Sequence, residues 1–136
     1  MDIVGQEPQI KVFLLDDHEV VRRGVAEVLE SDPGITVVGE AKNAAEALAR
    51  VPALRPDVAV LDVRLPDGDG LDLAAELQQG GKTRPIVVVL SASVLPSERD
   101  AALRSGADAF LAKPYHPNEL VALVGRLLEG GTPEPV

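Results

Sequence analysis

The chain has 136 residues, the size of a single domain with a substantial core, and its 13 Lys and Arg against 22 Asp and Glu give a net charge of −9. A surface this acidic repels phosphate backbones and anionic lipids, so we expect this chain to bind neither nucleic acid nor membrane. The absence of cysteine excludes disulfides, thiolate metal sites and thiol nucleophiles. No apolar run approaches the roughly 20 residues of a membrane span and no signal-peptide pattern is present, so we expect a cytoplasmic protein.

Five short apolar runs predict β-strands. They are rich in β-branched residues and nearly uninterrupted, and they cover 10–15 (IKVFLL), 35–39 (ITVVG), 57–61 (DVAVL), 85–90 (PIVVVL) and 109–112 (AFLA). Strands that are apolar on both faces are typical of a parallel sheet covered by helices on both sides.

The segments between these strands have helical periodicity. The first helix is expected over about 19–30, with a buried face formed by Val21, Val25, Val28 and Leu29. The second begins at Asn43, whose side chain can cap it, with Glu46 three residues later as in a capping box. The other helices are expected to begin at or near Gly70, Pro96 and Pro117.

Five strands alternating with five helices predict one doubly wound α/β domain over residues 10–129. Residues 1–9 and 130–136 lack periodicity and are rich in Gly, Pro and polar residues. We therefore expect a flexible N-terminal extension and a flexible tail or linker stub at these ends.

Polar side chains follow four of the five predicted strands. In a parallel sheet these strand ends share one edge, which is where ligands bind. The residues expected to meet there are Asp16 and Asp17 after the first strand, Asp62 after the third, Ser91 after the fourth and Lys113 after the fifth.

This set of groups indicates phosphoryl chemistry. Three clustered carboxylates repel one another and require a cation, and hard oxygen ligands without Cys or paired His favour Mg²⁺. Lys113 and the metal would neutralise a phosphoryl group, and Ser91 would hydrogen-bond one of its oxygens. Asp62 ends the most apolar strand, so it is the carboxylate placed to act as nucleophile and form an aspartyl phosphate.

Several of these residues also have simpler interpretations. Asp17 could be no more than a helix cap, and the stretch LPDGDG (65–70) is a turn signal by itself. We interpret Arg22 and Arg23 as solvated helix charges rather than a nucleic-acid patch. His18 is interpreted as a polar residue of the first helical turn, without a role at the site.

Four stretches of the sequence resemble the receiver domain of two-component response regulators. They are FLLDDHEVVRRG (13–24), LDVRLPDGDG (61–70), VLSA (89–92) and AKP (112–114), and the resemblance covers residues 10–129. It implies a flavodoxin-like fold of receiver type. The first two stretches look most like regulators with a C-terminal helix-turn-helix, whereas KPYHPNEL (113–120) looks more like the winged-helix subfamily.

The resemblance also assigns roles to individual residues. It implies that Asp62 is the phosphoacceptor and that Mg²⁺ is held by Asp16, Asp17, Asp62 and the backbone carbonyl of Arg64. Ser91 and Lys113 would contact the phosphoryl group, with a cis bond to Pro114. Phe110 falls at the position of the family's switch aromatic, and it lacks the hydroxyl that a tyrosine would provide.

The implied function is phosphorelay signalling. The chain would accept a phosphoryl group from a sensor histidine kinase or a phosphotransfer protein and then switch conformation. Its catalysis would be limited to self-phosphorylation from phosphodonors and autodephosphorylation. A homodimer on phosphorylation is expected through the fourth helix, fifth strand and last helix, a face that carries Arg99, Arg104 and Asp108.

Two alternatives to a receiver that functions alone remain open. One is the regulatory fragment of a DNA-binding transcriptional response regulator, since GGTPEPV (130–136) resembles the start of an interdomain linker but cannot contain a helix-turn-helix. The other is a haloacid-dehalogenase-like phosphatase. That family has a D-x-D nucleophile on its first strand, whereas this chain has adjacent aspartates there and no cap domain.

Overall fold

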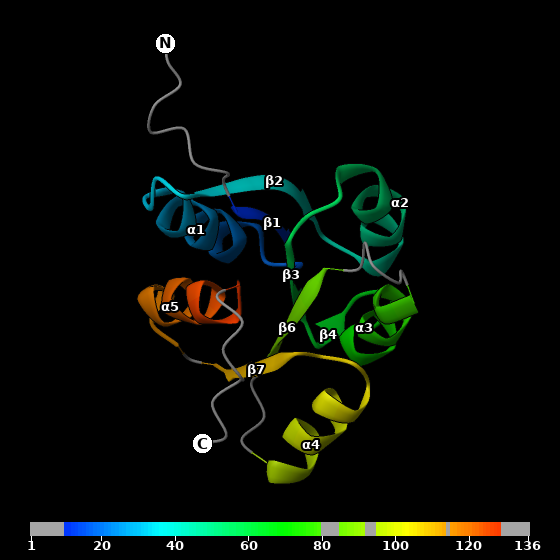
Figure 1. Cartoon of the computed structure of the whole chain (residues 1–136). Helices are drawn as coiled ribbons and strands as arrows, with labels where there is room; N and C mark the ends of the chain where they lie inside the picture. Colours follow the sequence, from blue (N-terminus) through cyan, green and yellow to red (C-terminus); the bar gives the residue numbers. More distant parts are fainter. Residues whose placement is uncertain (1–9, 80–84, 92–94, 114, 129–136) are drawn as a thin grey trace.

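The structure is a computed structural model that describes residues 10–79, 85–91, 95–113 and 115–128 (Figure 1). Its centre is a five-stranded parallel sheet in the order β2-β1-β3-β6-β7. The strands are β1 (Ile10–Leu15), β2 (Ile35–Ala41), β3 (Val58–Asp62), β6 (Ile86–Ser91) and β7 (Ala109–Ala112). The predicted fold class, a doubly wound α/β domain of flavodoxin-like receiver type, is confirmed.

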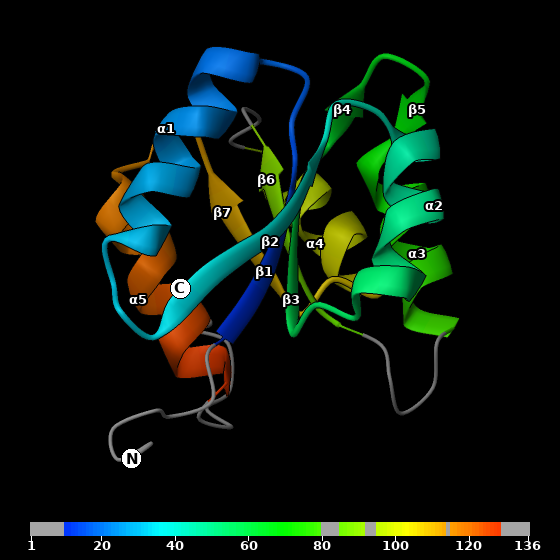
Figure 2. The ribbon, with the colours of Figure 1, turned by 90° about the horizontal axis from the view of Figure 1, so that it is seen from above.

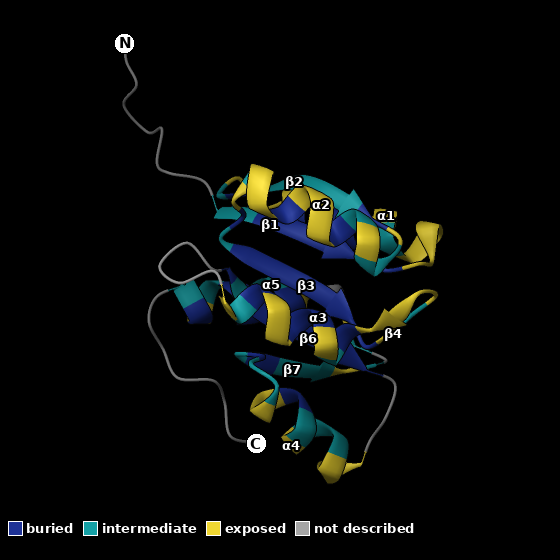
Figure 3. Ribbon diagram, turned by 90° about the vertical axis from the view of Figure 1, so that its right-hand side faces the viewer, coloured by how far each residue is buried: buried dark blue, intermediate teal, exposed yellow. Residues whose placement is uncertain are grey.

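The helices of the described residues cover both faces of the sheet (Figure 2). They are α1 (Glu19–Glu30), α2 (Ala44–Leu54), α3 (Gly70–Leu77), α4 (Pro96–Arg104) and α5 (Pro117–Leu128). Helices α1 and α5 pack on one face, over a core that includes Val12, Leu29 and Leu120. Helices α2, α3 and α4 pack on the other face, over a core that includes Phe13 and Leu61. The central strands are therefore buried on both sides (Figure 3).

The boundaries differ from the predicted ones by small amounts. Strand β2 continues to Ala41, and β3 and β6 each lie one residue later than their apolar runs suggest. Asp57, at the start of the third apolar run, lies just before β3. Its carboxylate accepts a hydrogen bond from the Lys11 amide at 2.8 Å. Because both strands are shifted by one residue, Asp62 is the final residue of β3 and Ser91 is the final residue of β6.

The helices begin where the sequence predicts, but the buried face of α1 differs from the predicted one. Asn43 caps α2 by accepting a hydrogen bond from the Glu46 amide at 2.8 Å, as the capping box predicts. Val21 was expected in the core of α1 but is 48% exposed. The buried residues of this helix are Val25, Ala26 and Leu29, so its first turn lies outside the core.

The proposed N-terminal extension and C-terminal tail lie outside the described residues, as does Pro114 with its expected cis bond. None of the helices in the described part of the chain has the length and apolar character needed to span a bilayer.

Candidate functional site

The carboxyl ends of the central strands carry three buried polar residues. Within the described residues, the polar side chains classed as buried are those of Asp16, Asp62 and Ser91, which are 5%, 6% and 3% exposed. Asp16 directly follows β1, Asp62 ends β3 and Ser91 ends β6. These three strands are neighbours in a parallel sheet, so their carboxyl ends lie side by side at one edge. The structure therefore brings Asp16, Asp62 and Ser91 together there, as predicted.

Lys113 reaches into this acidic edge from the end of β7. Its Nζ lies 3.1 Å from Oδ2 of Asp62 and 3.7 Å from Oδ2 of Asp16. Its backbone amide donates a hydrogen bond of 2.7 Å to the carbonyl of Ser91, which holds the start of the following loop against β6. Lys113 therefore faces the site, as its position after the fifth predicted strand suggested.

The environment of Asp62 opposes its negative charge. Burial raises the pKa of Asp62 above its ordinary value, and the Asp16 carboxylate adds to this increase. Lys113 and the backbone amide of Arg64 partly counteract it by favouring the ionised form. Two buried carboxylates thus share the single positive charge of Lys113, which leaves an excess of acidic groups at the site.

These carboxylates fit a hard divalent cation. Ligand atoms of Asp16, Asp17, His18 and Asp62 all lie within 4.8 Å of one another. Asp17 is exposed, so the cluster opens to solvent on its side. Oxygen ligands with room for water are the set that Mg²⁺ prefers.

The interpretation of Asp17 as a helix cap is wrong. The residue at the N-cap of α1 is His18, which makes no side-chain capping hydrogen bond. His18 is instead close to the acidic pair, with Nδ1 3.2 Å from Oδ1 of both Asp16 and Asp17. Sequence reasoning gave His18 no role, although its position directly after the two aspartates placed it beside them.

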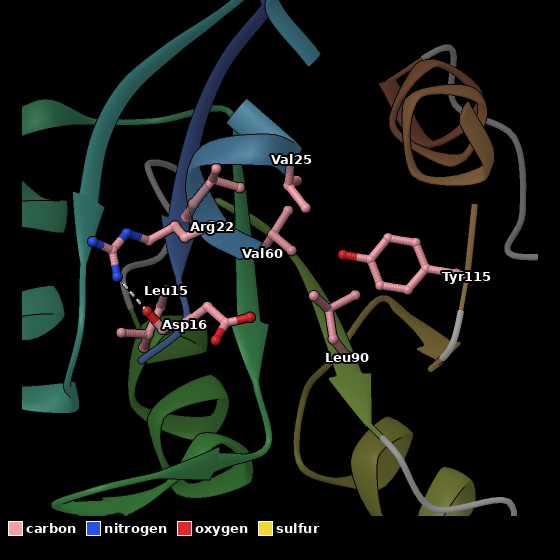
Figure 4. Close-up of a pocket in the computed structure, with 8 residues that line it drawn as sticks. Leu15, Asp16, Arg22, Val25, Val60, Leu90 and Tyr115 are labelled. Atoms are coloured by element: carbon pink, nitrogen blue, oxygen red, sulfur yellow. Dashed lines mark hydrogen bonds between the residues drawn. The ribbon is translucent and has the colours of Figure 1, made fainter. Parts of the chain in front are cut away.

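Arg22 is not a solvated helix charge. Its side chain is only 13% exposed, and Nε donates to Oε1 of Glu40 at 2.8 Å. Its guanidinium also donates to the backbone carbonyl of Asp16 at 2.5 Å (Figure 4). Arg22 thereby ties α1 to the ends of β1 and β2. Arg23 is 71% exposed and matches the prediction.

This difference predicts unequal effects of removing the two arginines. Arg22→Met should lower the free energy of unfolding by about 1–3 kcal/mol, because the Asp16 carbonyl and Glu40 lose a charged donor. Arg23→Met is the matched control and should change it by less than about 0.5 kcal/mol, because the Arg23–Glu19 pair is exposed. Urea denaturation measures both. Equal effects of the two variants would contradict the role given to Arg22.

A small pocket beside Asp16 brings in Tyr115, which sequence reasoning missed. Its lining residues come from β1, α1, β3, β6 and the segment before α5: Leu14, Leu15, Asp16, Arg22, Val25, Val60, Leu90 and Tyr115. The Tyr115 hydroxyl points into this pocket (Figure 4). Burial, with the charges of Asp16 and Asp62, raises the pKa of Tyr115 to about 12. An aromatic residue two positions after Lys113 was the available signal.

Ser91 and Phe110 were both predicted to respond to phosphorylation. The Ser91 hydroxyl donates a hydrogen bond to Oε1 of Glu98 in the first turn of α4. Phe110 lies in β7, is half-buried and packs against the core under α2, α3 and α4.

The loop after Asp62 is tied to a neighbouring helix. LPDGDG forms the predicted turn, as a hairpin of β4 (Arg64–Leu65) and β5 (Gly68–Asp69). The Asp67 carboxylate at its tip accepts hydrogen bonds from the Ala44 and Ala45 amides at 2.8 and 3.0 Å, which caps α2 from outside the helix.

At the other end of the loop, a Cβ added to Gly70 would lie 2.2 Å from the Asp62 carbonyl oxygen. The loop thus packs directly on the strand that carries Asp62.

The cap formed by Asp67 predicts a pH-dependent stability. The amides of Ala44 and Ala45 lower the pKa of Asp67 below its ordinary value of 3.8, so the ionised form stabilises the fold above that pH. Asp67→Ala should lower the melting temperature at pH 7 by about 3 °C. The difference from wild type should shrink as the pH falls from 3.8, where the unfolded chain takes up the proton, through the lowered pKa of Asp67 in the folded protein. A difference that stays constant between pH 7 and pH 3 would contradict this account.

The chain thus forms a doubly wound domain with clustered aspartates and an inward lysine at the strand ends. The family model of the response regulator receiver domain matches residues 12–125. The chain therefore belongs to the response regulator receiver domain family.

Relatives across several bacteria support this membership. The chain is 49% identical over 115 residues to the DNA-binding transcriptional activator DevR/DosR of Mycobacterium tuberculosis, which covers 85% of this chain and 52% of the relative. It is 39% identical to the transcriptional regulatory protein UhpA of Salmonella typhimurium, over 90% of this chain and 60% of that protein. The chain thus spans little more than half the length of these curated relatives.

Solved structures agree with the fold. The signal receiver domain of the putative response regulator NarL from Mycobacterium tuberculosis superposes with a TM-score of 0.85 at 35% identity, covering 91% of this chain and 99% of that domain. The receiver domain of the Francisella response regulator 1452 gives a TM-score of 0.81 at 29% identity, covering 91% and 98%.

Proposed function

We propose that this receiver domain accepts a phosphoryl group on Asp62, with Mg²⁺ bound at the adjacent aspartates. The observation that carries the proposal is the placement of a buried Asp62 beside Asp16 with the Lys113 ammonium 3.1 Å from its carboxylate. Incubation with acetyl phosphate and Mg²⁺ tests it, because intact mass spectrometry should show one added phosphoryl group.

The chemistry is a transfer between two nucleophiles. A carboxylate oxygen of Asp62 attacks the phosphorus of a phosphohistidine, forming a P–O bond as the P–N bond breaks. The bonding electron pair leaves with the imidazole nitrogen of the donor. Its product is an acyl phosphate on Asp62 and a dephosphorylated donor histidine.

Residues around Asp62 serve this transfer in distinct ways. The Lys113 ammonium lies near both Asp62 and Asp16, and it would form an ion pair with a phosphoryl oxygen once the phosphoryl group is on Asp62. Ser91 would donate its hydroxyl proton to another phosphoryl oxygen. Mg²⁺, held by Asp16, Asp17, Asp62 and the Arg64 carbonyl, would supply further charge neutralisation when bound.

The partner we propose is a sensor histidine kinase or a phosphotransfer protein, and the location we propose for this domain is the cytoplasm; no step requires nucleic acid or membrane. In this role the domain has no enzymatic activity beyond self-phosphorylation and autodephosphorylation. The similarity to DevR/DosR, a DNA-binding transcriptional activator about twice as long as the matched region, also favours a second candidate function, the regulatory part of such an activator.

Phosphorylation should also favour a dimer through α4, β7 and α5. Strand β7 is at the edge of the sheet, with α4 and α5 on either side of it (Figure 1). Arg104 is exposed on this face, whereas Asp108 is half-buried. Its carboxylate accepts hydrogen bonds from the Val87 amide at 2.8 Å and from Gln78 at 3.4 Å.

Light scattering measures this association. With beryllofluoride as phosphoryl mimic, we expect the molar mass to rise toward that of a dimer, and Arg104→Ala to weaken the association several-fold. A monomer at high concentration in the presence of the mimic would contradict the dimer. Unchanged amide exchange over 96–113 and 115–128 would also contradict a switch on this face.

A further inference from the structure

The Ser91 hydroxyl is held by a carboxylate that lies outside the acidic cluster. Ser91 is buried at the end of β6, and its Oγ donates to Oε1 of Glu98 in the first turn of α4. A hydroxyl carries a single proton, and an ionised carboxylate accepts hydrogen bonds without donating any. The proton that Ser91 gives to Glu98 therefore cannot be given at the same time to a phosphoryl oxygen.

The backbone of Ser91 is fixed beside the proposed phosphoacceptor. In the pairing of β3 with β6, Asp62 lies opposite Leu90, so Ser91 is the next residue along that strand. On its other side, the Ser91 carbonyl accepts a hydrogen bond of 2.7 Å from the Lys113 amide. A change in the partner of the hydroxyl must therefore come from rotation of the side chain or from movement of Glu98.

Glu98 is part of a helix with little anchorage in the core. The buried side chain of α4 is that of Ala102, and Leu103 on the same helix is 40% exposed. A helix that buries so little apolar surface can move at a low free-energy cost. The hydrogen bond from Ser91 to Glu98 therefore links the end of β6 directly to the first turn of α4.

We propose that Glu98 is a positioning residue that holds the Ser91 hydroxyl in the unphosphorylated protein and opposes the phosphorylated state. The inference rests on the proposed function of Asp62. A phosphoryl group on Asp62 and the Glu98 carboxylate compete for one proton. When Ser91 turns to the phosphoryl group, Glu98 loses its partner and the first turn of α4 is released. Phosphorylation is thereby linked to movement of α4.

Binding of beryllofluoride in the presence of Mg²⁺ tests this competition, with the dissociation constant measured by ¹⁹F NMR or calorimetry. Glu98→Ala should tighten binding about tenfold, because a hydrogen bond to a charged group no longer has to be broken. Glu98→Gln retains a weaker, neutral acceptor and the side-chain volume, so its gain should be smaller. The matched control is Asp100→Ala, which removes an exposed carboxylate from the same helix and should change binding less than about twofold.

A double-mutant cycle separates the hydrogen bond from general charge repulsion. In a Ser91→Ala background, Glu98→Ala should give no gain, because the shared proton is absent. An equal gain with and without the Ser91 hydroxyl, or no gain in Glu98→Ala, would overturn the proposal. In the absence of beryllofluoride, amide exchange over 96–104 should be faster in both Glu98→Ala and Ser91→Ala than in wild type.

Failure of the proposed function would look different. If wild type does not bind beryllofluoride, or if Asp62→Asn binds it as wild type does, the role of Asp62 is wrong and the inference about Glu98 is overturned with it. Binding that depends on Asp62 but is unchanged in the Glu98 variants overturns the Glu98 role alone.

Discussion

Asp62→Asn should take up no phosphoryl group from acetyl phosphate or from a phosphohistidine donor. The amide of asparagine has nearly the volume of the carboxylate but is not a nucleophile toward phosphorus, so the fold is retained while the transfer is lost. Intact mass spectrometry measures the result, and Asp69→Asn, at an exposed aspartate of the same loop, is the control that should be phosphorylated normally. Phosphate uptake by Asp62→Asn at the wild-type level would exclude Asp62 as the phosphoacceptor.

The same variant should be more stable than wild type at neutral pH without Mg²⁺. Burial raises the pKa of Asp62 above 3.8, which means that its ionised form is disfavoured in the folded protein. Removing this charge should raise the melting temperature by about 3 °C at pH 7. The wild type regains this stability as the pH falls through the raised pKa of Asp62, so the difference between the two proteins should disappear below pH 3.8.

Asp17→Ala should eliminate the stabilisation of this protein by Mg²⁺. In wild type, Mg²⁺ well above its dissociation constant should raise the melting temperature by about 5 °C, because a ligand that binds only the folded state stabilises it. Asp17 is the exposed member of the carboxylate cluster, so its removal deletes a ligand while leaving the buried Asp16 and Asp62 in place.

Thermal melts with and without Mg²⁺ provide the measurement. Asp72→Ala removes an exposed aspartate from the first turn of α3, outside the cluster, and should keep the full response to Mg²⁺. Equal shifts in wild type and in Asp17→Ala would contradict the assignment of the metal site.

The fold class and the members of the site could be predicted because both follow from local patterns. Continuous apolar runs indicate strands buried on two faces, and their alternation with helical segments indicates a parallel sheet. In such a sheet all carboxyl ends lie at one edge, so the residues after each run, such as Asp62 and Lys113, had to be near one another. The strand order β2-β1-β3-β6-β7 did not follow, because hydropathy records burial but not which strands are neighbours.

The partners of individual side chains required the tertiary structure. Arg22 has the sequence context of a surface helix charge, and only the approach of β2 supplies Glu40 and turns the side chain inward. Asp108 looked like a charge on the outer face of the domain, but it is half-buried and its carboxylate accepts a hydrogen bond from the Val87 amide of the neighbouring strand. Val21 fits the apolar stripe of α1, yet the first turn of that helix lies beyond the core.

By itself, the sequence determined a five-stranded α/β receiver domain and the set of polar residues at its strand ends. Only the tertiary structure decided which atoms those residues face: Lys113 shared between Asp62 and Asp16, and the Ser91 hydroxyl held by Glu98. The physical reason is the range of the interactions. Periodicity along the chain reflects burial within one element, whereas a hydrogen bond or ion pair requires angstrom-level placement of two elements that the chain itself does not encode locally.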